Sequence, residues 1–570
     1  MMPVLLPSVL LAALLQVGPH PIVDSAHILR DARNAQRDFE RFRRARLPVG
    51  DVYGGTCDVR IGRYCYWRGD DDDEIETPPP EAKSITARRG QLIHSLDRAA
   101  ATLPADQWIA GQRVRYLVDA GRFDEAIRAA RRDCRARVSW CDALAGYAAH
   151  GAGRFALADS LYEAALAAMP SAERCDWLDV ADELSDELHD SYAPLDCAAR
   201  ERFARRAFRL GAPLYMISPT DLLTEHLARR TFDRIVEHSA TVEGDSWGDD
   251  ERELGDRYGW PKWFTRGEPR IGIDDLTPPI VGHDSGQPYY FLPSIETFEH
   301  PGGTSTSDWA LSDPRARTGY APSYARSIHE LPHQIALFRH GDSTLAVGAW
   351  NAARDTTLRG RTLSAALVLA ADSGPLAIAR DSTARASGRI TTVGMLDSGL
   401  VSVEVLAVTD RRAARARVGA PPRDTGRVAL SDLLLFAQSA SADDGAEDEP
   451  DFAMAVDSAL TSEVIPQSRS VGVYWETYGL RSAEPVQYTL SVEPVDVGFM
   501  RRVAERLRFA DPTSGFRIEW RDVPHTIGGV ASRSTRLDLS RLRRGRYRVQ
   551  LDVMASGGIT ASATRTFEVP

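Results

Sequence analysis

The chain has 570 residues, of which 43% are hydrophobic and 26% charged, and this composition excludes a mainly disordered or collagen-like protein. Its length predicts about three or four domains. The 69 basic and 80 acidic residues leave a net charge of −11, which opposes any sequence-independent binding of nucleic acid.

The first 22 residues are predicted to be a secretory signal peptide. An apolar stretch runs from Val4 to Val17 and ends at a Gly-Pro break. A membrane span needs ~20 apolar residues, so this stretch is too short to form one, and no later run approaches that length. The alternative interpretation is a buried first helix, because no Lys or Arg precedes the stretch and no A-x-A cleavage site follows it.

The six cysteines support export to an oxidising compartment. They fall into three local pairs, none of which forms a C-x-x-C motif: Cys57 and Cys65, Cys134 and Cys141, and Cys175 and Cys197. Two or three local disulfides are expected, although six cysteines allow about fifteen pairings and the sequence does not decide among them. The alternative is a set of free buried thiols in a cytosolic protein.

A helical-repeat domain is predicted over residues 25–240. Ser25 can cap a first helix that has to end before Pro48, because apolar residues recur there at steps of three and four. The run at 69–80, GDDDDEIETPPP, lacks the alternating ligands of a calcium loop and is interpreted as a solvated linker.

The clearest internal repeat lies within residues 107–170. Gly121-Arg122-Phe123 recurs as Gly153-Arg154-Phe155, and the second copy continues with Ala158, Ala165 and Pro170. This segment resembles tetratricopeptide repeats, which consist of helical hairpins of about 34 residues. The resemblance implies a stack of hairpins with a concave surface suited to binding.

Residues 241–329 are predicted to form an irregular, aromatic-rich connector. Tyr258, Trp260, Trp263 and Arg266 are the candidate binding residues, because aromatic side chains interleaved with Arg can stack on sugars or anchor a protein partner. The alternative, which the sequence favours, is that these side chains join the helical domain to the segment that follows.

One stretch of the sequence matches a zinc-binding motif. His329, Glu330 and His333 match H-E-x-x-H, but Pro332 opposes the helix that this zinc motif requires, so a turn into a strand is expected instead. No phosphate-binding loop or G-x-S-x-G elbow occurs, and no catalytic residue is assigned. The chain contains only two lysines, Lys83 and Lys262, and such a strong preference for Arg is typical of GC-rich bacterial genomes.

Two antiparallel β-sandwiches are predicted for the C-terminal half, at 330–420 and 428–570. Stretches that alternate or form short apolar runs, such as Leu363–Leu369, Val401–Val405 and Val471–Trp475, are typical of strands. The tail resembles the end of immunoglobulin-like domains of secreted bacterial proteins, with a strand at Tyr547–Val553 and a turn at Ser556-Gly557-Gly558.

These patterns predict an exported bacterial protein, periplasmic or extracellular, that binds a protein partner or acts as a scaffold without a cofactor. No nucleic acid partner and no membrane span after signal removal are expected. The alternative is a secreted hydrolase or glycan-binding protein acting on cell-wall or environmental polymers. In a third possibility, the sandwiches only space the helical domain from the envelope.

Overall fold

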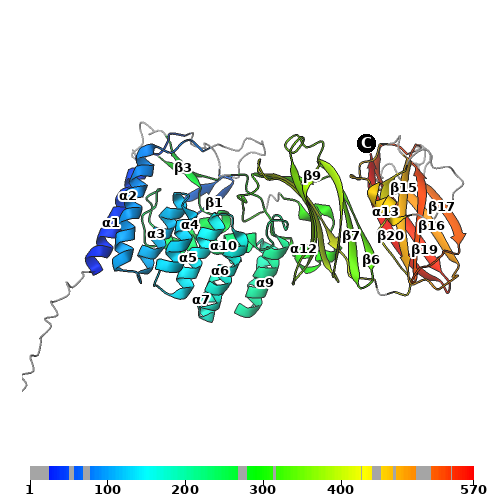
Figure 1. Ribbon diagram of the computed structural model, residues 1–570, viewed down its shortest axis with the longest axis horizontal. Coiled ribbons are helices and arrows are strands. Elements are labelled where there is room, and N and C mark those ends of the chain that lie inside the picture. The colour runs from blue at the N-terminus through cyan, green and yellow to red at the C-terminus, as the bar shows by residue number, and fades with distance from the viewer. Residues whose placement is uncertain are drawn as a thin grey trace, which may run out of the picture.

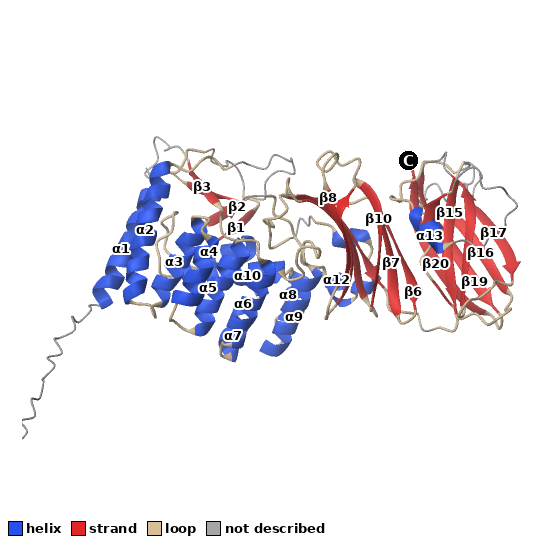
Figure 2. Cartoon of the chain, in the orientation of Figure 1, coloured by secondary structure: helices blue, strands red, loops and turns tan. Residues whose placement is uncertain are grey.

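The computed structural model describes residues 25–50, 57–67, 78–267, 279–284, 286–311, 316–424, 426–438, 451–466, 470–495, 515–540 and 542–570. Within these ranges a helical region is followed by antiparallel-rich β-sheets, which confirms the predicted fold class (Figure 1). Figure 2 shows the helices at one end of an elongated molecule and the sheets at the other. The expected signal peptide at 1–22 and residues 69–77 of the acidic linker lie outside the described residues.

The first helix, α1 (Ser25–Arg44), begins at Ser25 and ends before Pro48, as predicted. Its inner face buries Ala32, Gln36, Phe39 and Glu40. The helices that follow are α2 (Lys83–Thr102), α3 (Gln107–Asp119), α4 (Phe123–Arg128), α5 (Val138–Gly151), α6 (Phe155–Ala167), α7 (Ser171–Trp177), α8 (Asp186–Tyr192), α9 (Cys197–Leu210) and α10 (Asp221–Val236). A π-helical turn, Ala129–Asp133, extends α4.

The internal repeat corresponds to two helical hairpins, α3 with α4 and α5 with α6. Gly121 and Gly153 occupy the two turns with φ of 69° and 70°, a left-handed conformation that favours glycine. Ala158 and Ala165 are fully buried, so the helices can pack closely at these positions. The helical hairpins are confirmed, while membership of the tetratricopeptide family is not shown.

Three local disulfides connect the cysteines in the order in which they occur: Cys57 to Cys65, Cys134 to Cys141, and Cys175 to Cys197. The first closes the hairpin of β1 (Val59–Ile61) and β2 (Tyr64–Tyr66). The third links α7 to α9. Each bond closes a short loop and thereby restricts the unfolded chain.

The segment predicted to be irregular contains more regular structure than expected. Helix α11 (Asp249–Tyr258) follows α10, and β3 (Trp263–Arg266) pairs with β4 (Ile280–His283). The sequence DDERELGDRY has few apolar residues, so it shows no helical period. Its three leading acidic residues stabilise the helix N-terminus instead. This charge signal is independent of apolar spacing. The short helix α12 (Ile295–Glu299) lies further along.

The first group of strands forms a five-stranded sheet, β5-β12-β11-β8-β9, and a three-stranded sheet, β10-β7-β6. Trp350, Leu367 and Val403 are buried in the core between them. The strands are β5 (Ser327–Glu330), β6 (His333–His340), β7 (Ser343–Asn351), β8 (Leu363–Ala371), β9 (Ala377–Ala384), β10 (Ser387–Gly394), β11 (Gly399–Ala407) and β12 (Arg412–Ala420). Only β5, among these, pairs in parallel, with β12.

The second group forms the sheet β13-β15-β14, which β18 extends by pairing with β15, and the sheet β17-β16-β19-β20. Trp475, Tyr488 and Leu551 fill the core between these sheets. The elements are β13 (Ala429–Leu430), β14 (Leu434–Ala437), α13 (Phe452–Asp457), β15 (Ser470–Tyr478), β16 (Val486–Pro494), β17 (Phe516–Asp522), β18 (Val530–Asp538), β19 (Gly545–Ala555) and β20 (Ile559–Val569). The predicted turn at Ser556-Gly557-Gly558 joins β19 to β20.

The three parts are packed against one another through buried contacts. Leu400 and Val368 of the five-stranded sheet belong to the same apolar core as the helices. Phe338 of β6 packs on Tyr474 of β15, with the two ring centroids 5.9 Å apart. The helical region is therefore held in a fixed position relative to the sheets.

Candidate functional site

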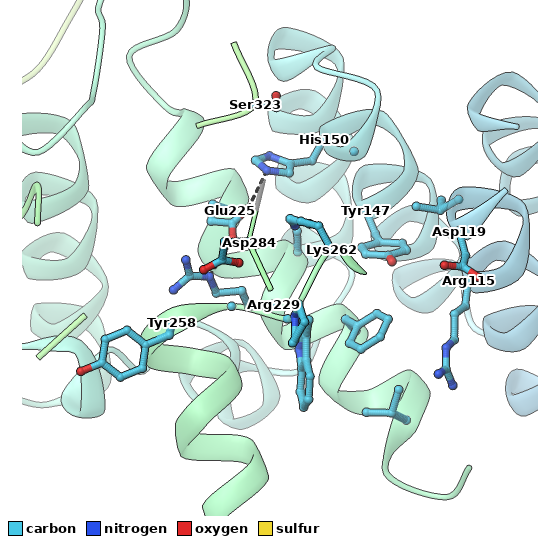
Figure 3. A pocket seen from close by; sticks show the side chains of 18 of the residues that line it. Arg115, Asp119, Tyr147, His150, Glu225, Arg229, Tyr258, Lys262, Asp284 and Ser323 are labelled. Atoms are coloured by element: carbon cyan, nitrogen blue, oxygen red, sulfur yellow. Dashed lines mark hydrogen bonds and ion pairs between the residues drawn. The ribbon is translucent and has the colours of Figure 1, made fainter. Parts of the chain in front are cut away.

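A cavity of about 390 Å³ lies between helices α3, α5 and α10 and the segment that follows α10. Cavities of this size accommodate small molecules or the side chains of a partner. Its middle is apolar and aromatic, lined by Val118, Phe123, Tyr147, Phe232, Val236, Trp260 and Phe264. Charged groups gather at both ends (Figure 3).

His150 and Glu225 form the buried centre of one end. The Nε2 atom of His150 lies 2.8 Å from a carboxylate oxygen of Glu225, and its Nδ1 lies 3.0 Å from Thr224 Oγ1. Arg229, one helical turn beyond Glu225, donates to its other oxygen at 2.7 Å. Burial alone would raise the pKa of Glu225, but the charge of Arg229 and the contact with His150 hold that pKa well below its usual value. This glutamate is therefore ionised and fully paired.

Asp284 and Lys262 border the same end but are not paired in this way. Burial raises the pKa of Asp284 to about 6, although the charges of Lys262 and Arg229 oppose the shift. Asp284 keeps some accessible surface because it faces the cavity. Among the described residues its carboxylate makes no hydrogen bond and no direct ion pair.

The opposite end is formed by ionic side chains of α1 and α3. Arg43 donates to Asp119 at 3.4 Å, and Arg115 donates to the fully buried Glu40 at 3.2 Å. The guanidinium of Arg115 also lies over the Phe232 ring, 5.4 Å from its centroid. These contacts fix both arginines in the wall of the cavity.

The four binding residues predicted from the sequence are not brought together. Tyr258 and Trp260 line the cavity, and Trp260 packs against Phe232 with 5.0 Å between ring centroids. Trp263 instead stacks on His283 at 3.9 Å, and Arg266 extends the β3 strand through its backbone. The binding role of all four residues stays a prediction.

Sequence reasoning missed His150, Glu225, Arg229, Lys262 and Asp284. Helix α10 reads DLLTEHLARRTFDRIV, in which charged residues surround the helix and indicate a solvated face. The structure instead buries nearly every residue of this helix. The available signal was the spacing of Glu225 and Arg229 at i and i+4, which is equally common on exposed helices.

The residues of the H-E-x-x-H pattern lie on two strands, which confirms the predicted extended conformation. His329 and Glu330 end β5, and His333 begins β6. His329 pairs with Asp355 at 2.9 Å, while His333 Nδ1 lies 2.9 Å from the Leu331 carbonyl oxygen. In the part of the chain that the structure describes, no group of three or more His, Cys, Asp or Glu side chains is arranged to hold a metal ion.

Comparison with known proteins gives neither a family nor a function. No family model matches the chain, and no curated protein does. Matches to solved structures include red sea bream transglutaminase, with 12% identity over 42% of this chain and 31% of that one and a TM-score of 0.14. A tetra-tandem repeat from the extending region of a large adhesion protein gives 13% identity over 42% of this chain and 49% of that one, with a TM-score of 0.14.

The chicken CNTN1 FN1–FN3 domains match at 11% identity over 42% of this chain and 67% of that one, with a TM-score of 0.13. This chain thus spans about a third of the transglutaminase and half of the adhesion repeat. TM-scores this low carry no argument about function. Among the described residues, none of the helices has the length and apolar character needed to cross a membrane.

Proposed function

We propose that this chain is an exported, non-enzymatic interaction protein of the bacterial cell envelope that captures a partner in the cavity between its helical hairpins and the segment 241–329. The cavity is the observation that carries this proposal. It combines an aromatic middle with charged ends, the arrangement in which a few polar groups orient a ligand and apolar walls supply affinity.

The architecture supports the same function. Helical hairpins of the tetratricopeptide type present concave surfaces that bind partners, and immunoglobulin-like sandwiches are common spacers in secreted proteins. Three local disulfides suit an oxidising compartment. We therefore assign recognition to the helical region and spacing to the two sandwiches.

A hydrolytic role has less support at this site. Both ring nitrogens of His150 lie within hydrogen-bonding distance of protein oxygens, on Glu225 and Thr224. A histidine between a carboxylate and a hydroxyl resembles a hydrolase triad. The Thr224 hydroxyl, however, is fully buried, does not line the cavity and donates to the Asp221 carbonyl oxygen, so it is not an accessible nucleophile.

The test compares two tryptophan substitutions in the same segment. Trp260→Ala removes a wall of the cavity and is expected to weaken partner capture by at least about tenfold, because buried aromatic anchors are typical binding hot spots. Trp263→Ala removes a ring of equal size that stacks on His283 outside the cavity lining and donates to the Asp284 carbonyl oxygen at 3.3 Å, so a smaller loss of capture than for Trp260→Ala is expected. The readout is affinity capture from envelope and culture medium, quantified by mass spectrometry.

A second variant separates binding from folding. Trp260 also packs near Trp247, so its removal can loosen the segment itself. Ala321→Trp fills the cavity from a loop position without deleting an internal contact. Equal capture by wild type, Trp260→Ala and Ala321→Trp, all with native circular dichroism, would contradict the assignment of the cavity as the capture site.

A further inference from the structure

One end of the cavity offers two charged groups of opposite sign that are not paired with each other or with other described residues. Asp284 and Lys262 both line the cavity, and Figure 3 shows them near Glu225 and Arg229. Asp284 is half-buried, whereas Lys262 is exposed. The charge of Lys262 opposes the raised pKa of Asp284 and helps to lower the pKa of Glu225, yet no direct ion pair joins Asp284 to Lys262. The other charges at this end, Glu225 and Arg229, already pair with each other.

An uncompensated carboxylate in the wall of a cavity favours a cationic ligand. Burial destabilises the ionised form of Asp284 because surrounding protein replaces water, and its basic neighbours only partly offset this cost. A ligand ammonium that reached the carboxylate would supply a charge-assisted hydrogen bond, which is about twice as strong as a neutral one. The exposed Lys262 in turn has no acceptor among the residues that the structure describes.

Aromatic rings lie next to this charged end. Tyr147 lines the cavity between the end that holds Glu225 and the end that holds Arg115 (Figure 3). Phe232 contacts both Tyr147 and Trp260, with ring centroids 6.0 Å and 5.0 Å away. A large apolar or aromatic side chain entering the cavity would therefore meet a continuous aromatic wall.

We propose that this cavity binds an α-ammonium group together with its neighbouring carbonyl or carboxylate oxygen. The ammonium binds at Asp284 and the oxygen at Lys262. An aromatic or large apolar side chain of the ligand lies between Tyr147, Phe232 and Trp260. A free α-amino acid and the N-terminal residue of a polypeptide share this chemistry. This inference rests on the proposed function only because both use the same cavity.

The affinity for such a ligand rises with pH. Asp284 has a pKa of about 6 in the free protein, so it is protonated below that pH and cannot accept an ionic bond. Comparison with Asp284→Asn separates Asp284 from the other charged or titratable groups at this end, which are His150, Glu225, Arg229 and Lys262. L-phenylalanine keeps its ammonium charged from pH 5 to pH 7. Its binding is expected to be about tenfold weaker at pH 5 than at pH 7, and to release protons near pH 6. Arg229 stays charged over this range, because the neighbouring Glu225 raises its pKa against the effect of burial.

The experiment titrates the full chain with matched probes at pH 7 by isothermal calorimetry. L-phenylalanine and L-phenylalaninamide carry the ammonium, whereas N-acetyl-L-phenylalaninamide lacks it and phenethylamine lacks the carbonyl. The first two are expected to bind at least tenfold more tightly than the last two. Asp284→Asn is expected to abolish the preference over the acetylated probe, whereas Asp190→Asn, an exposed substitution in α8, should retain it.

The two sources of the ligand differ in their dependence on Lys262. A free amino acid presents a carboxylate, so L-phenylalanine should bind more tightly than its amide, and Lys262→Gln should remove the difference. Equal or tighter binding of the amide indicates the N-terminal residue of a polypeptide. Lys83→Gln, which changes the other lysine of the chain, is the matched control.

Equal binding of the acetylated and free-amine probes to the wild type would overturn the inference, as would binding that Asp284→Asn leaves unchanged. Failure of every probe to bind at millimolar concentration would overturn it as well. The proposed function would survive these results if partner capture still depended on Trp260, so the two proposals fail separately.

Discussion

Replacing Glu404 by alanine is expected to lower the free energy of unfolding of the helical region and first sandwich by about 3–5 kcal/mol, because it leaves a buried cation without its partner. Glu404 lies at the centre of β11, and both it and Arg417 are fully buried. Its carboxylate accepts the backbone N–H groups of Tyr215 at 3.0 Å and Met216 at 2.8 Å, and it lies 3.5 Å from Arg417. One side chain thus connects the helices to the sheet.

The measurement is urea unfolding followed by tryptophan fluorescence. Glu404→Gln keeps an acceptor of the same shape and should lose less stability than Glu404→Ala. Glu163→Ala breaks an ion pair with Arg205 in which the carboxylate is 48% exposed, so a loss below about 1 kcal/mol is expected. Similar losses for Glu404→Ala and Glu163→Ala would show that the buried network contributes no more than a surface pair.

Local periodicity explains why much of the fold could be predicted from the sequence. Helix α1 buries one face whose apolar residues recur at steps of three and four, whereas strands β8, β11 and β15 are buried at nearly every residue and are recognisable as short runs rich in Val, Leu and aromatic residues. The turns at Gly153 and Gly557 could also be predicted, because each turn needs a positive φ, which glycine adopts readily. These features depend only on neighbours along the chain.

The cavity could not be predicted because its residues come together only in three dimensions. Helix α10 is polar in sequence, but it lies among α3, α5 and α6, where its charges pair with groups far along the chain. Glu225 meets His150, for example, across 75 positions of sequence that carry no common pattern. The aromatic residues of the segment 241–329 were visible, but only the fold separates Trp260 in the lining from Trp263 outside it.

The buried Asp233 of α10 lowers the stability of the folded protein by an amount that depends on pH. Asp233 belongs to α10, and its Oδ1 has no hydrogen-bond partner among the described residues. Its other oxygen is 3.7 Å from Arg252 Nε. Burial, and next the negative charge of Asp256, raise the pKa of Asp233 from 3.8 to about 7. Asp256 itself is paired with Arg230 at 3.0 Å.

Replacing Asp233 by asparagine is therefore expected to stabilise the protein at pH 8 by about 2–4 kcal/mol and to have little effect near pH 4. The sign follows from proton binding. Between pH 4 and pH 7 the unfolded chain has already released this proton while the folded chain retains it, so wild-type stability falls as pH rises through that range. Above pH 7 the folded chain carries the poorly compensated charge. Asparagine has the same shape and no charge, so the variant should lack this decline.

The measurement is the difference in unfolding free energy between variant and wild type in urea, at pH 4.5, 6 and 8. Taking the difference removes the contribution of Asp221, whose pKa is also raised to about 7. Asp256, with a pKa of about 6, interacts with Asp233, so the difference reports Asp233 together with its effect on Asp256. Asp190→Asn, on the exposed surface of α8, should change stability by less than about 0.5 kcal/mol at every pH. A constant difference for Asp233→Asn across the three pH values would show that Asp233 is ionised in the folded protein throughout, and that the buried space around α10 provides it with more compensation than its contacts indicate.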